Sequence, residues 1–321
     1  MVSYKTNRTH AECRVINADS REELLNWKNQ VDVVVTSPPY ADARHKHYDS
    51  ISPSQFKDWF LTFHEPFFEA LKPSGSLVIN IKDKVVDGVR HRYVWQTIEA
   101  LALHGWHCID DYIWQKTNPM PGYWPTRLRD GWEYCFHLAK SKSPFINQDA
   151  VHVPAGDWMT SRLAKLSTND LSRHNSANKS GFGRDLSKWV GKKTVLPSNV
   201  ISAALVGKNK GHPAVFPLDI PEFFIKLLCP EDGLVCDPFG GSGTTAIVAA
   251  QLSRRSLTID NNAEYCKTAV ARLKKEGVIA IEVTARDPKS KNGGRGGYAI
   301  PQDTAKQITF FDKPRILGTR A

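Results

Sequence analysis

Short apolar runs alternate with longer amphipathic stretches along most of this chain. Residues 31–35 form a β-branched run, which is typical of a strand buried on both faces. Further strands are expected at residues 15–17, 77–81, 108–115, 134–139, 234–236 and 256–259, with helices at 22–27, 53–71, 93–103, 221–228 and 244–252. The helix over 53–71 is expected to follow a cap at Ser52 and to end before Pro73 and Gly75. This alternation predicts an α/β fold with a largely parallel sheet.

The run at 31–35 ends abruptly in Ser37, Pro38, Pro39 and Tyr40, because prolines cannot donate to a sheet ladder. The Ser37 hydroxyl, the Pro38 carbonyl and the Tyr40 ring are therefore held stiffly at the carboxyl end of a strand, where open α/β sheets bind ligands. Two acceptor oxygens and an aromatic face suit a planar heterocycle that carries an exocyclic amine. The same residues also suit a stiff strand-ending turn or a polyproline-type ligand.

A second segment combines a strand, a glycine-rich turn and a helix over residues 234–252. Gly241 and Gly243 allow the backbone to approach a ligand, and the helix amino terminus favours a carboxylate. No lysine follows the last glycine, so this is not a phosphate-cradling P-loop. The next strand ends in Asp260, where an acidic side chain can accept from the two hydroxyls of a ribose.

With both segments in view, the chain resembles the amino-methyltransferases of DNA that use S-adenosylmethionine, in their permuted β class. The resemblance spans about residues 12–275. It rests on seven short pieces in the family's order: residues 17–20, 36–40, 77–81, 132–138, 212–217 and 237–245, and Asp260. Ala18 stands where the family most often has glycine, which is a departure at the first turn.

This resemblance implies a Rossmann-like methyltransferase fold that is circularly permuted. The expected parts are a catalytic half at 1–145, an inserted loop-rich target-recognition region at 146–211, a cofactor-binding half at 212–285 and a flexible basic tail at 286–321. Its catalytic residues would be Ser37, Pro38, Pro39 and Tyr40. The residues that would hold S-adenosyl-L-methionine are Asp19, Asp237, Phe239, Gly241, Ser242, Gly243, Thr244 and Asp260.

The implied reaction is methyl transfer to the exocyclic amine of a base flipped out of double-stranded DNA. In the family, Ser-Pro-Pro-Tyr accompanies cytosine N4 more often than adenine N6. We therefore expect an N4-cytosine methyltransferase of a restriction-modification system, with a cognate restriction endonuclease as a partner and adenine N6 as the alternative target. Two alternative interpretations are a catalytically idle DNA-binding module and an RNA methyltransferase.

Composition agrees with a nucleic-acid partner. The net charge is +10, and residues 151–211 hold ten basic against three acidic residues, a balance that favours a polyanion, although a solvated insertion is the alternative. The six cysteines have no paired spacing, which argues against a zinc site or a disulfide scaffold. No run approaches the roughly 18 apolar residues of a membrane span, and no apolar signal region opens the chain, so we expect a cytoplasmic protein.

Three further segments carry candidate contacts. Tyr123, Trp124, Arg127 and Arg129 mix aromatic and cationic side chains, which suits stacking and phosphate contact or, alternatively, surface packing. Residues 44–47 are two cations and two histidines in a polar stretch, which suits phosphate contact, closure over substrate or an exposed loop. Gln307 to Phe311 resembles the peptides that bind sliding clamps, or docks back on the domain.

Overall fold

The computed structural model describes residues 11–42, 51–156, 161, 164–165, 190–206, 217–278 and 281–285. The first half contains β1 (Cys13–Asn17), α1 (Ser20–Glu23), η1 (Leu24–Trp27), β2 (Val31–Thr36), α2 (Pro53–Leu61), α3 (His64–Ala70), β3 (Leu71–Ile81), β4 (Lys84–Val86), β5 (Val89–His91), α4 (Tyr93–Leu103), β6 (His107–Lys116) and β7 (Trp132–Ala139). The rest contains η2 (Gln148–Val151), β8 (Val153–Pro154), β9 (Thr194–Val195), β10 (Val200–Ala203), α7 (Asp219–Leu228), β11 (Leu234–Asp237), α8 (Thr244–Gln251), β12 (Arg255–Asp260), α9 (Ala263–Lys275) and β13 (Ile281–Ala285).

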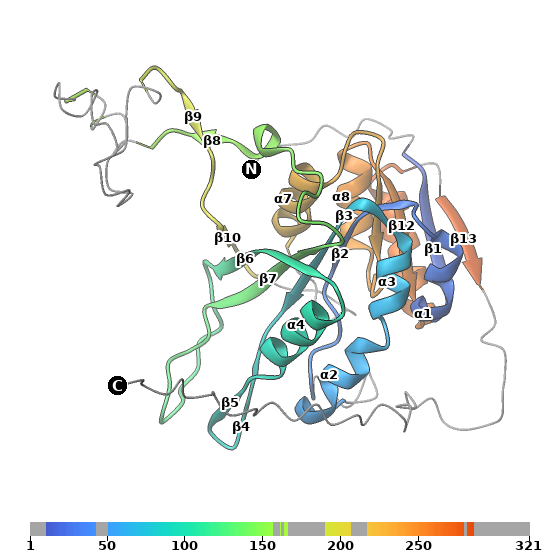
Figure 1. Ribbon diagram of the computed structural model, residues 1–321, viewed down its shortest axis with the longest axis horizontal. Coiled ribbons are helices and arrows are strands. Elements are labelled where there is room, and N and C mark those ends of the chain that lie inside the picture. Colours follow the sequence, from blue (N-terminus) through green and yellow to red (C-terminus); the bar gives the residue numbers. More distant parts are fainter. Residues whose placement is uncertain are drawn as a thin grey trace, which may run out of the picture.

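One nine-stranded sheet runs through the molecule in the order β10-β6-β7-β3-β2-β11-β12-β1-β13 (Figure 1). β7 pairs antiparallel with β3 and β6, and every other pairing in this sheet is parallel. The predicted α/β class with a mostly parallel sheet is confirmed. β2, early in the chain, lies next to β11, so the two segments singled out in the sequence end side by side.

Helices cover both faces of the sheet because its central strands are apolar on both sides. Val34 packs toward α2, α3 and α4, while its neighbours Val33 and Val35 pack toward α7 and α8. Farther along the sheet, α8 and α9 pack against β1 through Val15 and Ala269. The result is a helix–sheet–helix sandwich.

The prediction of a single helix over residues 53–71 is wrong. Pro66 has no N–H to donate to the carbonyl of Thr62, so the chain forms α2 and α3 with a break at Thr62 and Phe63. Leu71 already pairs with Val31, and Pro73 and Gly75 lie where the β2–β3 register shifts, inside β3 and not after a helix.

The bounds of the other elements differ less from those predicted. The helix expected at 22–27 begins earlier, as α1, and continues as the 3₁₀ helix η1, whereas α4 has the expected bounds. β10, within the expected recognition region, and β13 form the two edges of the sheet. β8 and β9 form a small separate ribbon that projects away from it (Figure 1).

Candidate active site

The carboxyl ends of β1, β2, β3, β11 and β12 meet at one edge of the sheet because these strands are parallel. We call it the carboxyl edge. β6 also ends there and β7 begins there, since β7 is antiparallel to both of its neighbours. All twelve residues expected at the site come from this edge or from the loops that leave it.

Asp237 joins the two predicted loops. Its Oδ1 accepts from Thr36 Oγ1 at 2.7 Å and from the Phe239 N–H at 3.2 Å, and its Oδ2 accepts from Thr245 Oγ1 at 2.7 Å. Burial raises the pKa of Asp237 to about 6, although the hydrogen bonds from Thr36 and Thr245 act in the opposite direction. Its carboxyl group is therefore engaged in holding β2, β11 and α8 together.

The glycine-rich turn after β11 depends on left-handed backbone. Gly241 and Gly243 have φ of 51° and 79°, and Gly243 caps α8. A Cβ on Gly240 would lie 2.2 Å from Thr258 Cγ2, so this position also requires glycine, which the sequence analysis did not single out. The turn therefore packs tightly on β12, with Gly240 directly against the Thr258 side chain.

Ser242 and Thr244 are buried in this turn, and their hydroxyls lie against Arg272 of α9. Arg272 Nη1 donates to the carbonyl and hydroxyl oxygens of Ser242 at 2.7 and 2.6 Å and to Thr244 Oγ1 at 3.1 Å. These two hydroxyls thus fix the turn to α9, a contact that the sequence did not indicate.

Asp260 is held by backbone N–H groups on both carboxylate oxygens. Oδ2 accepts from Gly241 at 2.9 Å and Oδ1 from Asn262 at 2.8 Å. Burial raises the pKa of Asp260, and these two hydrogen bonds oppose the increase. Each oxygen keeps a further lone pair, which matches two neighbouring hydroxyls of a ribose.

Asp19 lies in the turn after β1, next to Asp260. The Ala18 N–H donates to the Asp260 carbonyl at 3.1 Å, and Ala18 is not among the described residues with positive φ, so alanine is accommodated there. Asp19 caps α1 through the Arg21 N–H and forms an ion pair with the Arg21 guanidinium. Burial acts to raise the pKa of Asp19, but the contacts with Arg21 outweigh it and lower the pKa.

Phe239 is half-buried, and its ring packs on the aromatic cluster of α2 and α3. The ring centroids of Phe239 and Phe63 are 4.9 Å apart in an edge-on arrangement, and Trp59 lies 5.9 Å away. Phe63 occupies the break between the two helices, so the kink that Pro66 causes brings an aromatic support to the turn after β11.

Ser37 and Tyr40 begin a chain of hydrogen bonds. Ser37 Oγ donates to Tyr40 Oη over 3.5 Å, which is long for two hydroxyls, and Tyr40 Oη donates to Glu133 Oε2 over 2.6 Å. Asn80 Oδ1 lies 3.2 Å from the same hydroxyl. Burial, followed by the charge of Glu133, raises the pKa of Tyr40 well above its usual value, so the phenol keeps its proton.

Glu133 and Lys116 were missed in the sequence. They form an ion pair of 2.5 Å between Glu133 Oε1 and Lys116 Nζ, and each side chain is only 9% exposed. The sequence did contain a signal for Glu133. It is the one acidic residue in the mostly apolar strand β7 (Trp132–Ala139). A charged side chain inside such a strand needs a partner.

The loop between β6 and β7 leaves the carboxyl edge with large exposed side chains. Tyr123 is 88% exposed, whereas Trp124 is covered in part by the Arg127 guanidinium, 4.6 Å above its ring. Asp130 anchors the loop by ion pairs with Lys82, Arg90 and Arg127. Trp124 is thus 37% exposed and packs in part against Arg127, whereas Tyr123 and Arg129 are exposed, so the choice between surface packing and nucleic-acid contact stays open.

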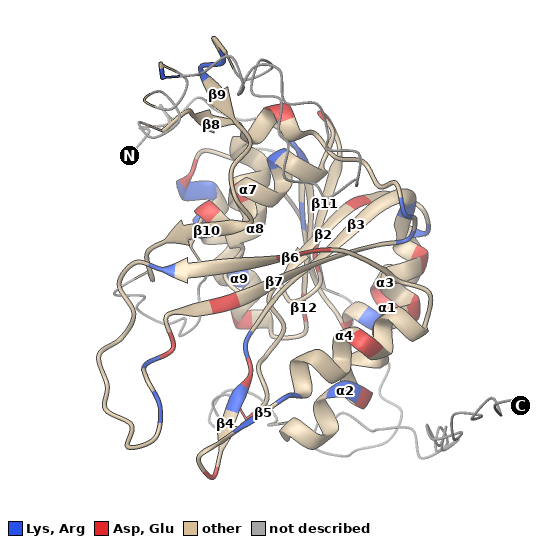
Figure 2. Cartoon of the chain, turned by 60° about the vertical axis from the view of Figure 1, so that its left-hand side comes forward, with Lys and Arg blue, Asp and Glu red and all other residues tan. Residues whose placement is uncertain are grey.

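The expected recognition region is described only in part. Lys165, Lys192 and Lys193 are exposed, and the other seven cations of that region lie outside the described residues. Residues 44–47 and Gln307 to Phe311 lie outside them too. Figure 2 marks the lysine and arginine positions along the backbone in blue, among them a segment at the β8–β9 ribbon. Within the described part of the chain, no helix is long and apolar enough to cross a membrane, and no group of three side chains suits a metal ion.

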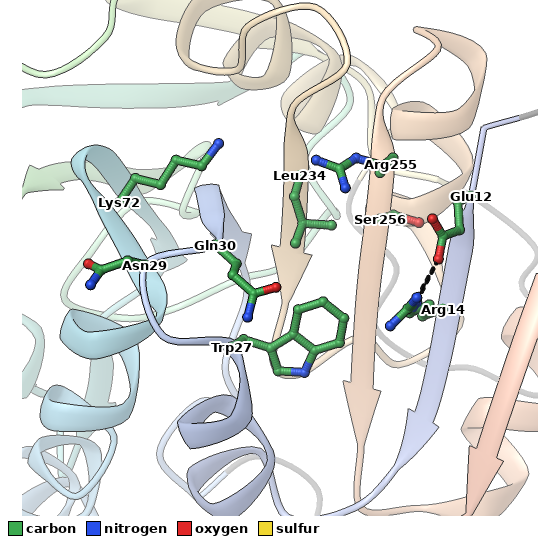
Figure 3. Close-up of a pocket in the computed structure, with 9 residues that line it drawn as sticks. All are labelled: Glu12, Arg14, Trp27, Asn29, Gln30, Lys72, Leu234, Arg255 and Ser256. Atoms are coloured by element: carbon green, nitrogen blue, oxygen red, sulfur yellow. Dashed lines mark hydrogen bonds and ion pairs between the residues drawn. The ribbon is translucent and has the colours of Figure 1, made fainter.

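A pocket of about 300 Å³ opens at the opposite edge of the sheet, which we call the amino edge (Figure 3). Its walls come from the starts of β1, β3, β11 and β12 and from the turn before β2. The lining residues are Glu12, Arg14, Trp27, Asn29, Gln30, Lys72, Leu234, Arg255 and Ser256. None of the site residues expected from the sequence lies there.

Comparison with known proteins places the chain in a family and a fold. The family described as DNA methylase matches residues 31–271. The type II methyltransferase M.PvuII of Proteus hauseri is 28% identical over 83% of this chain and 85% of its own, and M.SmaI of Serratia marcescens is 26% identical over 81% and 90%. The solved structure of the PvuII DNA methyltransferase, titled cytosine-N4-specific, superposes with a TM-score of 0.62 at 25% identity, over 82% of this chain and 87% of that one.

A putative DNA modification methylase of Thermus thermophilus, solved with S-adenosyl-L-methionine, shares the fold with a TM-score of 0.55, at 23% identity over 85% of this chain and 98% of its own. The fold and the two joined loops define a methyltransferase of the α/β type. The chain belongs to the DNA methylase family. The resemblance drawn from the seven sequence pieces is confirmed.

Proposed function

We propose that this protein transfers a methyl group from S-adenosyl-L-methionine to the N4 amine of cytosine in double-stranded DNA. The observation that carries the proposal is the hydrogen-bonded junction of two loops: Thr36, next to Ser37, donates to Asp237, next to the glycine turn. An acceptor for a base amine and a turn for a nucleoside cofactor are thereby fixed side by side.

The residues around the turn fit the cofactor. Asp260 has a lone pair left on each oxygen for the ribose hydroxyls, and the amino end of α8 favours the methionine carboxylate. Phe239 supplies an apolar wall, and Asp19 lies in the neighbouring turn after β1, on the side assigned to the adenosine. Bound there, S-adenosyl-L-methionine supplies an electrophilic methyl group.

Asp237, Ser242 and Thr244 act indirectly in this proposal. Their side chains are engaged with Thr36, Thr245 and Arg272, so they shape the turn that holds the cofactor. Gly241 and Gly243 give that turn its left-handed backbone. The cofactor then meets mainly backbone N–H groups there.

The chain's own chemistry on the base is orientation. Ser37 Oγ and the Pro38 carbonyl accept from the amine, which draws its lone pair out of the ring and aligns it for attack, while Pro39 fixes the backbone and Tyr40 stacks on the base. Stacking recovers part of the few kcal/mol needed to flip a base. Ser37 stays uncharged, so alignment in a dry pocket supplies most of the acceleration.

The preference for cytosine rests on Ser37 and on the relative that is titled cytosine-N4-specific. Adenine N6 is the alternative target, since a hydroxyl accepts from either amine. Several relatives are named type II methyltransferases, which supports a role beside a cognate restriction endonuclease.

DNA contact is proposed along the carboxyl edge. The exposed Tyr123 and Arg129 extend from the β6–β7 loop, which leaves the sheet at this edge. A cation such as Arg129 suits the phosphate backbone, and an exposed aromatic ring suits an unstacked base.

The test uses methyl-deuterated S-adenosyl-L-methionine, unmethylated mixed-sequence duplex DNA and nucleoside mass spectrometry. Labelled N4-methylcytosine is the expected product. Labelled N6-methyladenine would keep the mechanism and reverse the base. No label despite cofactor binding by calorimetry would contradict the proposal and favour an RNA substrate or an idle DNA-binding module.

A further inference from the structure

We infer that Glu133, paired with Lys116, is a positioning residue that sets the direction of the hydrogen bonds leading to Ser37, so that Ser37 presents an acceptor to the target amine. The inference rests on the proposed function and adds a residue pair to it. It starts from three described contacts that end at a buried carboxylate: Ser37 to Tyr40, Tyr40 to Glu133, and Lys116 to Glu133.

The direction follows from counting protons. The Tyr40 hydroxyl has one proton, and the contact of 2.6 Å to Glu133 is the shortest that it makes. Its oxygen then has lone pairs but no proton for Ser37, which must donate to it. The Ser37 oxygen is left with lone pairs only, which is what an amine N–H requires.

Lys116 keeps this arrangement in one state. A buried carboxylate without a cation is costly, and Lys116 Nζ donates to the Glu133 oxygen that Tyr40 does not use. Trp114 lies beside the ammonium group, 5.1 Å from its ring centre to Lys116 Nζ. With both side chains equally buried, water cannot replace either partner easily.

Glu133→Gln tests the direction without changing the size of the side chain. An amide can donate to Tyr40 as well as accept from it, so Tyr40 is free to donate to Ser37, and the Ser37 lone pair is then lost to the base. We expect kcat to fall about tenfold. The KM for DNA and the dissociation constant of S-adenosyl-L-methionine, measured by calorimetry, should change less than about twofold.

Two controls separate positioning from stability. Asp32→Asn breaks a second lysine–carboxylate pair, that of the buried Asp32 with Lys72 at 2.8 Å, at the amino edge. It should lower the melting temperature without lowering kcat. Lys116→Arg should keep the charge and most of kcat, whereas Lys116→Met should behave as Glu133→Gln does.

The double variant decides the outcome. In a Tyr40→Phe background the chain is already cut, so adding Glu133→Gln should lower kcat by less than about twofold more. Additive losses, or a Glu133→Gln variant with wild-type kcat, would overturn the inference. A wild-type protein that methylates no DNA would instead defeat the proposed function, so the two failures are distinguishable.

Discussion

Each edge of the sheet holds a buried carboxylate that is paired with a lysine, but Lys72 at the amino edge is 37% exposed and Lys116 at the carboxyl edge only 9%. At the amino edge, Asp32 accepts from Lys72 and from the Leu234 N–H at 2.8 Å, so all its partners are structural. At the carboxyl edge, Glu133 accepts from Lys116 and from a tyrosine hydroxyl that leads to Ser37. Both carboxylates are buried and accept from a lysine. They differ in their other donor, which is a backbone N–H for Asp32 and the Tyr40 hydroxyl for Glu133, and this donor decides whether the carboxylate supports the fold or the site.

The edges also differ in how their loops are made rigid. At the carboxyl edge, two prolines stiffen the loop after β2, and left-handed glycines shape the turn after β11. At the amino edge, the pocket is walled by strand starts, with one ion pair, Glu12 with Arg14, among its lining residues (Figure 3). Substitutions at the carboxyl edge should therefore change binding and chemistry, and those at the amino edge should not.

The largest effect is expected on the affinity for S-adenosyl-L-methionine, when Asp260→Ala is compared with Glu12→Ala. Asp260 would lose two hydrogen bonds from the ribose, worth about 4 kcal/mol together, so the dissociation constant of S-adenosyl-L-methionine should rise roughly 1000-fold. Glu12 forms an exposed ion pair at the start of β1, worth less than about 1 kcal/mol. Calorimetry measures both, and an equal loss of DNA affinity in Asp260→Ala would contradict the assignment of Asp260 to the cofactor.

The next effect is on stability, through Asp237. Its pKa is raised from 3.8 to about 6 in the fold, so its contribution is fully present below pH 3.8 and is lost as pH rises through 6. The shift corresponds to about 3 kcal/mol. Relative to Asp237→Asn, the wild type should lose about that much unfolding free energy between pH 3 and pH 7.5.

Urea unfolding at both pH values checks this, because groups common to the two proteins cancel in the difference. A difference in unfolding free energy that stays constant across the range would mean that Asp237 titrates normally. Asp237 differs here from Asp32 of the amino edge, since its hydrogen-bond partners are hydroxyls and an N–H group with no cation among them.

Ser37→Ala should have an intermediate effect. One neutral acceptor for the target amine is lost, at roughly 2 kcal/mol, so turnover should fall about 30-fold while cofactor affinity stays the same. Ser256→Ala is the matched change at the amino edge, where Ser256 lines the pocket. Single-turnover methylation with saturating cofactor is the measurement, and unchanged turnover in Ser37→Ala would remove Ser37 from the mechanism.

The sequence predicted the two loops because each is a local signal: prolines that end an apolar run, or glycines between a strand and a helix. The charge of Glu133 inside an apolar strand was visible, but its partner Tyr40 could not be predicted, since the two residues are 93 positions apart and meet only because β7 runs antiparallel beside β3. The error over residues 53–71 has a local cause, as Pro66 breaks a helix that the apolar spacing alone would continue. The bounds of the expected recognition region remain a prediction.

The smallest effect is expected on the salt dependence of DNA binding, and two exposed arginines test it. Arg129 lies on the β6–β7 loop at the carboxyl edge, whereas Arg255 lines the pocket at the amino edge and donates to the Asp232 carbonyl at 3.1 Å. If DNA lies along the carboxyl edge, Arg129→Ala removes about one phosphate contact, and the slope of log K against log salt should fall in magnitude by about 0.9. Arg255→Ala should leave that slope unchanged. Fluorescence anisotropy with a labelled duplex at several salt concentrations measures both slopes. Equal changes in slope for the two variants would mean that the duplex contacts both edges of the sheet. DNA binding would then not be confined to the carboxyl edge.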